Sequence, residues 1–519
     1  MPNRTADELF QLIKTLEKGE KRNFKLYVSR NAAAEDLKIT QLFDALDKMD
    51  VYDEELLLRK NTSIQKQQLS NLKAHLFKQI LASLRLIKSE QTVDILIHEQ
   101  LVHASILYNK GLYHQSLKLL QKTKELAKSY NQITFWVQAL FFEKKIETLH
   151  ITRSFEHRAE ELALEVNELN ERLLVVGKLS NLALQLYGWY IKNGHVRDDA
   201  EIQDLKKFYT ENLPSNAQDF SGFYERLYLY QSQAWYGFIL QDFLTYYKNC
   251  KRWVDLFEKE SQMIKVESQH FIKGMHNLLN AHFMLRNDRK FIADIEKFED
   301  FYHSKEGTAT TNNQVQSFVY LYLAKLNHHF LEGSFSEGIM LIPTIEAKLS
   351  EYELQLDKHR TLIFYYKFAC LFFGAGDFDN SVVYLNKIIH WKADLRSDLQ
   401  CYARLLHLIA HYELGNDEIL ESQVRSVYRF MSKMKNLTIV ENEIFSFIRA
   451  SFSLNKREIK MAFEQLFSKL KQLEGSPTES RSFMYLDILS WLESKIKGVP
   501  VQAIIADRFK NRMQSETET

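Results

Sequence analysis

The chain is poor in the two residues that interrupt helices. Its 519 residues include only 5 prolines and 16 glycines. Proline breaks a helix interior and glycine marks turns, so their scarcity predicts long helices joined by short connections. Aromatic residues make up 13% of the chain, and side chains of this size fill the gaps between stacked helices.

Cysteine and net charge are scarce as well. The three cysteines, Cys250, Cys370 and Cys401, are widely spaced in apolar contexts, which argues against a disulfide framework. A formal net charge of +1 gives no overall attraction to nucleic acid or to an anionic membrane. No apolar run approaches the ~20 residues of a membrane span, and the first residues lack a secretory signal. We therefore expect a cytoplasmic protein that binds no membrane.

Residues 364–388 carry the clearest structural pattern. Apolar residues recur at the spacing of one helix face, which predicts a buried helix: Tyr365, Phe368, Ala369 and Phe372. Gly376 is predicted to end that helix, and Asp377 or Asp379 to cap the next one. Ser381 is small where the two helices must approach closely. The segment is therefore predicted to be a helical hairpin.

The order of residues in Tyr365–Ile388 resembles the tetratricopeptide (TPR) repeat. Weaker copies of the turn occur on both sides of this segment, at Gly111, Ser154, Gly194, Asp242, Asp288, Gly333, Gly415 and Lys456. Successive markers lie 39 to 48 residues apart, whereas a TPR repeat has about 34 residues. The resemblance implies an all-α fold, a right-handed α-solenoid of about 8–9 TPR-like helical hairpins with helical caps at both ends.

Four segments follow from this pattern. Residues 1–90 form an N-terminal helical cap or bundle, 91–473 the TPR-like repeats, 474–512 a C-terminal capping helix and 513–519 a disordered tail. Helices are predicted in the first segment over Ala6–Leu16, Lys21–Ser29, Leu37–Asp47 and Ser63–Lys88. Pro343 is predicted to kink or shorten the second helix of its hairpin.

No motif predicts an enzyme, a metal site or a cofactor. The glycines of Gly374-Ala375-Gly376 lack the order of a phosphate-binding loop and fall where a hairpin must turn. His407 and His411 share a helix face, but no third ligand stands at a suitable spacing. The cysteines have no neighbouring base in the sequence. We therefore expect a protein without catalytic residues.

The resemblance also implies a concave surface lined by the first helix of each hairpin. Aligning the small core residue of each hairpin selects the following residue, and the residue three positions further on, as partner-binding candidates: Tyr108, Trp189, Trp235, Phe238, His282, Lys325, His328, Cys370, Phe373 and His411. Such a surface suits an extended peptide or helix that carries apolar anchors and some negative charge. The alternative is that many of these side chains belong to the core.

A basic face in the N-terminal segment is a second candidate. Between Ser63 and Ser89 there is no acidic residue, and the cations gather opposite an apolar stripe: Lys66, Lys73, Lys78, Arg85 and Lys88. This face could meet an acidic protein or could simply be solvated. Aromatic residues do not interleave with the cations, which argues against nucleic-acid binding.

The sequence therefore predicts a protein- or peptide-binding scaffold that uses the concave face of the repeats. The alternative is a signalling regulator whose N-terminal helical module acts on an acidic protein partner. That arrangement resembles the peptide-regulated phosphatase and transcription-factor families, which join an N-terminal helical module to TPR hairpins.

Overall fold

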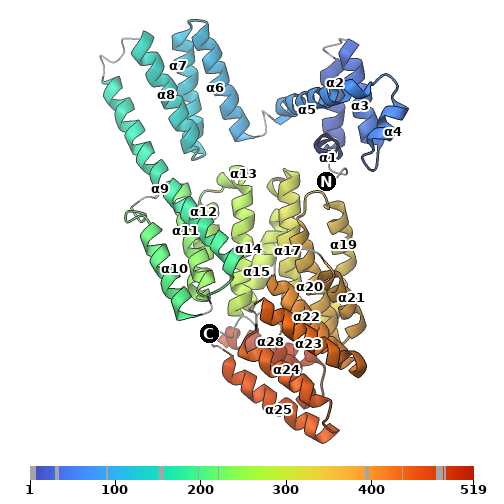
Figure 1. Cartoon of the computed structure of the whole chain (residues 1–519). Coiled ribbons are helices and arrows are strands. Elements are labelled where there is room, and N and C mark those ends of the chain that lie inside the picture. The colour runs from blue at the N-terminus through green and yellow to red at the C-terminus, as the bar shows by residue number, and fades with distance from the viewer. Residues whose placement is uncertain are drawn as a thin grey trace. The chain divides into compact units, whose positions relative to one another are not determined.

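A computed structural model describes residues 7–29, 34–88, 92–150, 157–196, 198–219, 221–391, 397–434, 437–474, 483 and 487–518 of the chain. Throughout these ranges the regular elements are α-helices and no strand occurs, so the predicted all-α class is confirmed (Figure 1). Contacts divide the chain into two compact units, residues 1–171 and 172–519. The division at residues 90, 473 and 512 rests on helix patterns and stays a prediction.

Unit 1 begins with a small helical bundle. Its helices are α1 (Glu8–Thr15), α2 (Lys18–Ser29), α3 (Ala34–Lys48), α4 (Glu54–Lys60), α5 (Lys66–Lys88), α6 (Val93–Asn109), α7 (Tyr113–Ser129), α8 (Ile133–His150) and the first part of α9 (Arg158–Asn193). Phe24, Phe43 and Leu76 are buried together in the bundle core. Four of its helices lie where the sequence predicted them, and α4 was not predicted.

The hairpin of α6 and α7 closes with the same hydrogen bond as the hairpin of residues 364–388. Ser116 Oγ donates to the carbonyl oxygen of Ala104 at 2.8 Å. In unit 2, Ser381 Oγ donates to the carbonyl oxygen of Ala369 at 2.9 Å. Both serines and both alanines are fully buried. A small side chain on each helix lets the backbones approach closely, so the predicted role of Ser381 is confirmed.

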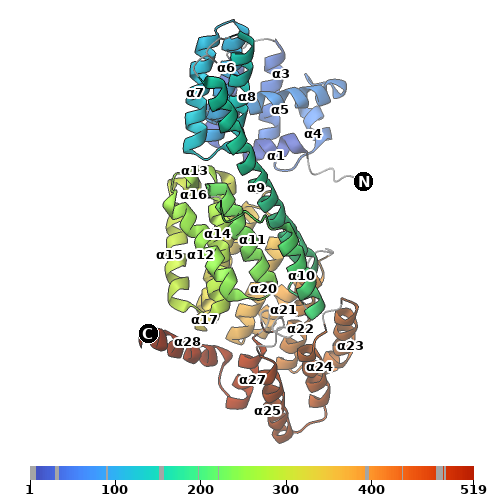
Figure 2. The same ribbon diagram turned by 90° about the vertical axis from the view of Figure 1, so that its left-hand side faces the viewer.

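Unit 2, taken by itself, is a row of packed helices (Figures 1 and 2). They are α10 (Asp199–Asn212), α11 (Phe223–Ile239), α12 (Phe243–Lys259), α13 (Met263–Val266), α14 (Ser268–Leu285), α15 (Asp288–His303), α16 (Lys305–Thr308), α17 (Thr311–Glu332), α18 (Phe335–Ile339), α19 (Ile342–Glu351), α20 (Lys358–Ala375), α21 (Phe378–Ile389), α22 (Ser397–Glu413), α23 (Asp417–Lys433), α24 (Ile439–Ser451), α25 (Lys456–Leu473), α27 (Ile488–Lys497) and α28 (Val501–Glu518). Helix α14 packs on α12, α15 and α17, and α20 packs on α17, α18, α21 and α22. Each hairpin thus buries its apolar faces against its neighbours.

The turns of unit 2 agree with their sequence signals. Gly376 ends α20 at a φ of 83°, a left-handed conformation that glycine adopts without steric cost. Asp377 then caps α21, because its Oδ1 accepts a hydrogen bond from the backbone N–H of Asn380 at 3.1 Å. The predicted interruption at Pro343 is also confirmed. The chain leaves α18 at Ile339, and Pro343 stands in the first turn of α19, where its missing N–H costs nothing. The marker at Ser154 lies outside the described residues.

The described C-terminal residues, 487–518, form two helices where the sequence predicted one. Helix α27 packs on α25, whereas α28 turns back and packs on α15, α17 and α20; Figure 2 shows it beside the end of α17. Arg512 Nε donates to Oδ2 of Asp288 at 2.7 Å, and Asp288 is buried. Helix α28 runs to Glu518, so helical structure extends into the segment that was expected to be a disordered tail.

Candidate functional site

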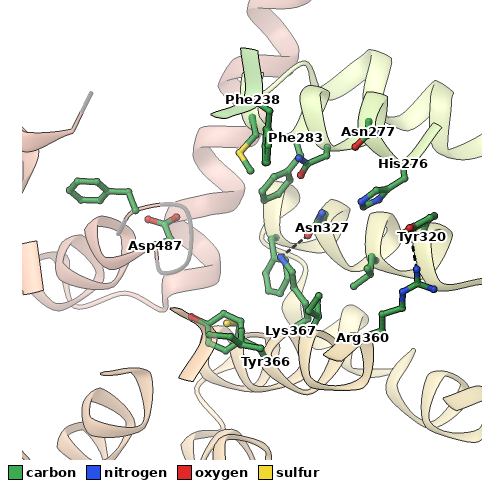
Figure 3. A pocket seen from close by; sticks show the side chains of 18 of the residues that line it. Phe238, His276, Asn277, Phe283, Tyr320, Asn327, Arg360, Tyr366, Lys367 and Asp487 are labelled. Carbon is green, nitrogen blue, oxygen red and sulfur yellow. Dashed lines mark hydrogen bonds between the residues drawn. The ribbon is translucent and has the colours of Figure 1, made fainter. Parts of the chain in front are cut away.

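A cavity of about 580 Å³ lies within unit 2 (Figure 3). Its walls come mainly from the first helices of successive hairpins, α11, α14, α17 and α20, together with the last turns of α9. Asp487 and Trp491 of the α27 segment and Val501 and Ile505 of α28 form another part of the wall. We call this space the inner cavity.

Aromatic side chains make up much of the wall. Eight of them come from α9, α11, α14, α17 and α20: Tyr190, Trp235, Phe238, Phe283, Tyr320, Phe330, Tyr366 and Phe373. Ring centroids of Trp235 and Phe238 lie 5.9 Å apart, and those of Tyr190 and Phe238 lie 5.1 Å apart. Large rigid rings bind apolar groups at a low cost in conformational entropy, so this wall can hold apolar side chains of a ligand.

Positive charge predominates among the polar groups of the wall. The cations are Lys273, Arg286, Arg360 and Lys367, and three histidines accompany them: His195, His276 and His359. Among the described lining residues Asp487 is the single carboxylate. Its Oδ1 accepts a hydrogen bond from the backbone N–H of Ser490 at 3.1 Å, and its Oδ2 accepts from the Ser490 hydroxyl at 2.8 Å.

Three of these basic groups surround the ring of Tyr320. The imidazole of His276 stacks on the ring at 4.0 Å between centroids. Lys273 Nζ lies 5.2 Å from the ring centroid, and the guanidinium carbon of Arg360 lies 5.6 Å from it. Burial, followed by the charges of Lys273 and Arg360, holds the pKa of His276 well below its ordinary value. His276 is therefore neutral, and the local positive charge comes from Lys273 and Arg360.

Lys367 occupies a second position in the wall. Its Nζ donates to Oδ1 of Asn327 at 2.8 Å and lies 4.8 Å from the ring centroid of Phe330 and 5.5 Å from that of Phe283. In the described part of the chain no carboxylate forms an ion pair with Lys367, and burial lowers its pKa to about 8. The ammonium group is thus held between an amide and two rings without a compensating anion.

Asparagine amides complete the polar wall. Asn277, Asn280 and Asn327 all line the inner cavity. The hydroxyl of Tyr246 donates to Oδ1 of Asn277 at 3.1 Å. An amide side chain offers donors and an acceptor to a ligand backbone, which makes these residues suited to hold an extended peptide.

Four of the ten predicted partner-binding residues line the inner cavity: Trp235, Phe238, Cys370 and Phe373. Phe238 and Phe373 are buried, so their rings also belong to the hydrophobic core. Burial raises the pKa of the Cys370 thiol to about 11. Cys370 is therefore a neutral thiol and supplies surface rather than a nucleophile.

Three other candidates on the middle hairpins are directed elsewhere. His282 is buried, and its Nε2 lies 3.0 Å from Oδ2 of Asp294 on α15. Lys325 forms an ion pair with Glu299, also on α15. His328 is half-buried, with its ring centroid 6.4 Å from that of Phe509 on α28. These three side chains join helices of the stack.

The remaining candidates also lie outside the inner cavity. Trp189 packs in the apolar cluster formed by α9, α10 and α11. His411 bonds through Nδ1 to the amide of Asn416 at 2.9 Å. Tyr108 lies in unit 1, where its hydroxyl bonds to Nε2 of His150 at 3.1 Å. Of these three, Trp189 is the one that packs among apolar residues, in line with the core alternative that the sequence left open.

The small core residue does not have the same orientation in every hairpin. On α11 and α20 the residue after it lines the inner cavity, as Trp235 and Cys370 show. On α14 and α17 the residue before it does so, as Asn280 and Leu323 show. The residue that faces the inner cavity therefore differs by two positions, relative to the small residue, between these pairs of helices.

Sequence reasoning missed Lys273, Asn327, Arg360 and Lys367. A signal for the last two was present on α20. The residues Arg360, Ile363, Lys367 and Cys370 recur at the spacing of a single helix face, and all four line the inner cavity. Taking every residue of that helix face as a candidate, instead of only the residues one and four positions after Ala369, would have identified both cations.

The predicted basic face of α5 is smaller than expected. Lys73 Nζ donates to Oδ2 of Asp7 at 2.8 Å and contacts the hydroxyl of Tyr52, and its side chain is 17% exposed. Lys73 therefore joins elements of the N-terminal bundle. Lys66, Lys78 and Arg85 are exposed, and the side chain of Lys88 lies outside the described residues.

His407 and His411 lie together but without further ligands. Their ring centroids are 4.4 Å apart. Nowhere in the described ranges do three or more histidine, cysteine, aspartate or glutamate side chains group as they would around a metal ion. Burial, with the charges of His411 and Arg404, lowers the pKa of His407 to about 4.

Comparison with known proteins gives no family. Neither a scan against protein-family models nor a search of curated proteins found a match to this chain. None of the described helices combines the length and the apolar character that crossing a membrane would need.

Proposed function

We propose that this chain is a cytoplasmic protein- or peptide-binding scaffold, built as a right-handed TPR-like solenoid of lengthened hairpins, and that its ligand lies in the inner cavity. The proposal rests on one observation: several hairpins contribute residues to the lining of a single cavity. Helices α11, α14, α17 and α20, each the first of its hairpin, direct aromatic or amide side chains into one space. The proposal assigns no chemical reaction to it.

The composition of the wall favours a peptide. A volume of about 580 Å³ is within the roughly 300–1,000 Å³ of ligand sites and has room for a short segment of chain. Aromatic rings can bind apolar side chains, and Asn277, Asn280 and Asn327 can pair with backbone groups between them. A preformed wall also spares the protein the cost of ordering it on binding.

Selection from a displayed library of random dodecapeptides on the full chain tests the proposal. We expect enriched sequences, and we expect Trp235→Ala to weaken the binding of a selected peptide about 10-fold or more, because Trp235 lies in the wall. Trp189→Ala is the matched control, since this half-buried tryptophan packs against the same apolar cluster as Trp235 but does not line the inner cavity.

The control should lower the melting temperature and leave the peptide affinity unchanged. Failure to select any peptide would contradict the proposed function. Equal affinities for the wild type and Trp235→Ala, with both proteins folded by circular dichroism, would place the binding site elsewhere.

A further inference from the structure

The inner cavity holds two lysines that no carboxylate of the described residues balances. Lys273 and Lys367 both line it, and across the described residues neither forms an ion pair with a carboxylate. An ammonium group removed from water without a counter-charge is costly, and proteins pair such groups or bind an anion there. The lowered pKa of Lys367 is consistent with this cost.

The four cations do not all have the same surroundings. Arg360 Nε lies 3.3 Å from Oδ2 of Asp357, an exposed residue on its own helix turn. At the end of α14, burial lowers the pKa of Arg286, and the negative charge of Asp487 raises it and so opposes this lowering. Arg360 and Arg286 are therefore partly compensated, whereas Lys273 and Lys367 are held by rings and, for Lys367, by an amide.

The two lysines also belong to neighbouring parts of one wall. Lys273 lies over the rings of Trp235 and Tyr320, and Lys367 over those of Phe283 and Phe330. Figure 3 shows Tyr320, Phe283, Asn327 and Lys367 around a common space. Each half-buried lysine thus sets its ammonium group against aromatic rings, where a charge-assisted hydrogen bond is stronger than in solution.

We propose that the ligand of the inner cavity is an acidic peptide segment with a carboxylate that accepts a hydrogen bond from Lys367, in a wall to which Lys273 adds positive charge, while its apolar side chains contact the surrounding rings. This inference rests on the proposed function and names the class of peptide that it binds. The carboxylate belongs to an Asp or Glu side chain or to a peptide C-terminus, since both offer the same two acceptor oxygens.

The test repeats the dodecapeptide selection on three forms of the full chain: wild type, Lys367→Met and Lys325→Met. Methionine keeps the length and apolar contacts of the lysine stem and removes its charge. Lys325 is the control because it is paired with Glu299 outside the cavity. We expect Asp and Glu to be enriched in peptides selected by the wild type and by Lys325→Met, and that enrichment to be reduced with Lys367→Met.

Affinity measurements on one selected peptide sharpen the result. Lys367→Met should weaken its binding about 10- to 100-fold, as expected for loss of a charge-assisted hydrogen bond, and Lys273→Met should act in the same direction. The melting temperature of Lys367→Met should be equal to that of the wild type or higher, because the variant removes a half-buried charge that no described carboxylate balances. Replacing each Asp or Glu of the peptide by its amide, or amidating its C-terminus, identifies which carboxylate is recognised.

The outcomes separate the two proposals. If peptides are selected without any enrichment of acidic residues, or if Lys367→Met selects the same acidic peptides with the same affinity, the inference is wrong and the proposed function stands. If the wild type selects no peptide, the proposed function itself fails. Acidic peptides that lose affinity with both lysine variants, and not with Lys325→Met, support both.

Discussion

Replacing Gly333 by alanine adds one methyl group and tests how closely the C-terminal helix α28 packs on α17. The glycine has a φ of +77° at the end of α17. A methyl group there would lie 2.7 Å from the backbone oxygen of Gln502 and 2.8 Å from the backbone nitrogen of Ala506, both on α28. Gly333→Ala therefore combines left-handed strain with a collision against a neighbouring helix backbone.

Gly376 provides the matched control for this substitution. It ends α20 in the same conformation, at a φ of +83°, and a methyl group there would meet nothing within 4 Å. Gly376→Ala should cost only the left-handed strain, about 1–2 kcal/mol. Gly333→Ala should cost that amount and a further 1–3 kcal/mol or so for overpacking against α28.

Melting temperature and hydrogen exchange of the full chain measure the difference. In a unit of this size each kcal/mol shifts the melting temperature by about 1–2 °C, so Gly333→Ala should melt several degrees below Gly376→Ala. Backbone amides of α28 should exchange faster in Gly333→Ala and not in Gly376→Ala. Equal melting temperatures, with α28 equally protected in both variants, would refute the close contact of α28 with Gly333.

Three further predictions concern charge and protonation. Lys73→Met should destabilise unit 1 by about 1–3 kcal/mol because it leaves Asp7 unpaired, whereas the exposed Lys78→Met should change its melting by less than a degree; equal effects would contradict the pairing. The pKa of His407 is lowered from 6.5 to about 4, so the unfolded chain binds the extra proton first, and its contribution to stability is complete above pH 6.5 and is lost as the pH falls toward 4. His407→Gln should flatten the fall in melting temperature over that range, and an unchanged slope would argue against a buried neutral imidazole. Cys370, whose thiol pKa is raised to about 11, should react with maleimide at pH 7.5 far more slowly than free cysteine, and a comparable rate would contradict its burial.

Local signals predicted much of the fold because they depend on only a few neighbouring residues. The left-handed turn at Gly376, the cap at Asp377 and the close approach at Ser381 each follow from the conformational range or size of one side chain. The break at Pro343 follows from a missing N–H. Helix α4 was missed because seven residues are too few to show a clear period.

The lining of the inner cavity was harder to predict. Trp235 and Cys370 were found because their hairpins keep the orientation that the resemblance implied. Lys325 and His282 were selected by the same rule but contact α15, because on their helices the cavity-lining face includes the residue before the small one. Periodicity shows that a helix has a buried face, but it does not show which neighbour that face meets.

The sequence by itself determined that the chain is helical and where many of its helices turn. Those features depend on side-chain size, capping and backbone freedom within a few residues. Only the tertiary structure decided that Lys367 and Lys273 share a cavity with aromatic rings, and that α28 returns to pack on α17 rather than extending the row. Both depend on which apolar surfaces meet across long separations in the chain. Burying apolar surface is favourable for any complementary pair of faces, so the residues of one face do not specify which other face it contacts.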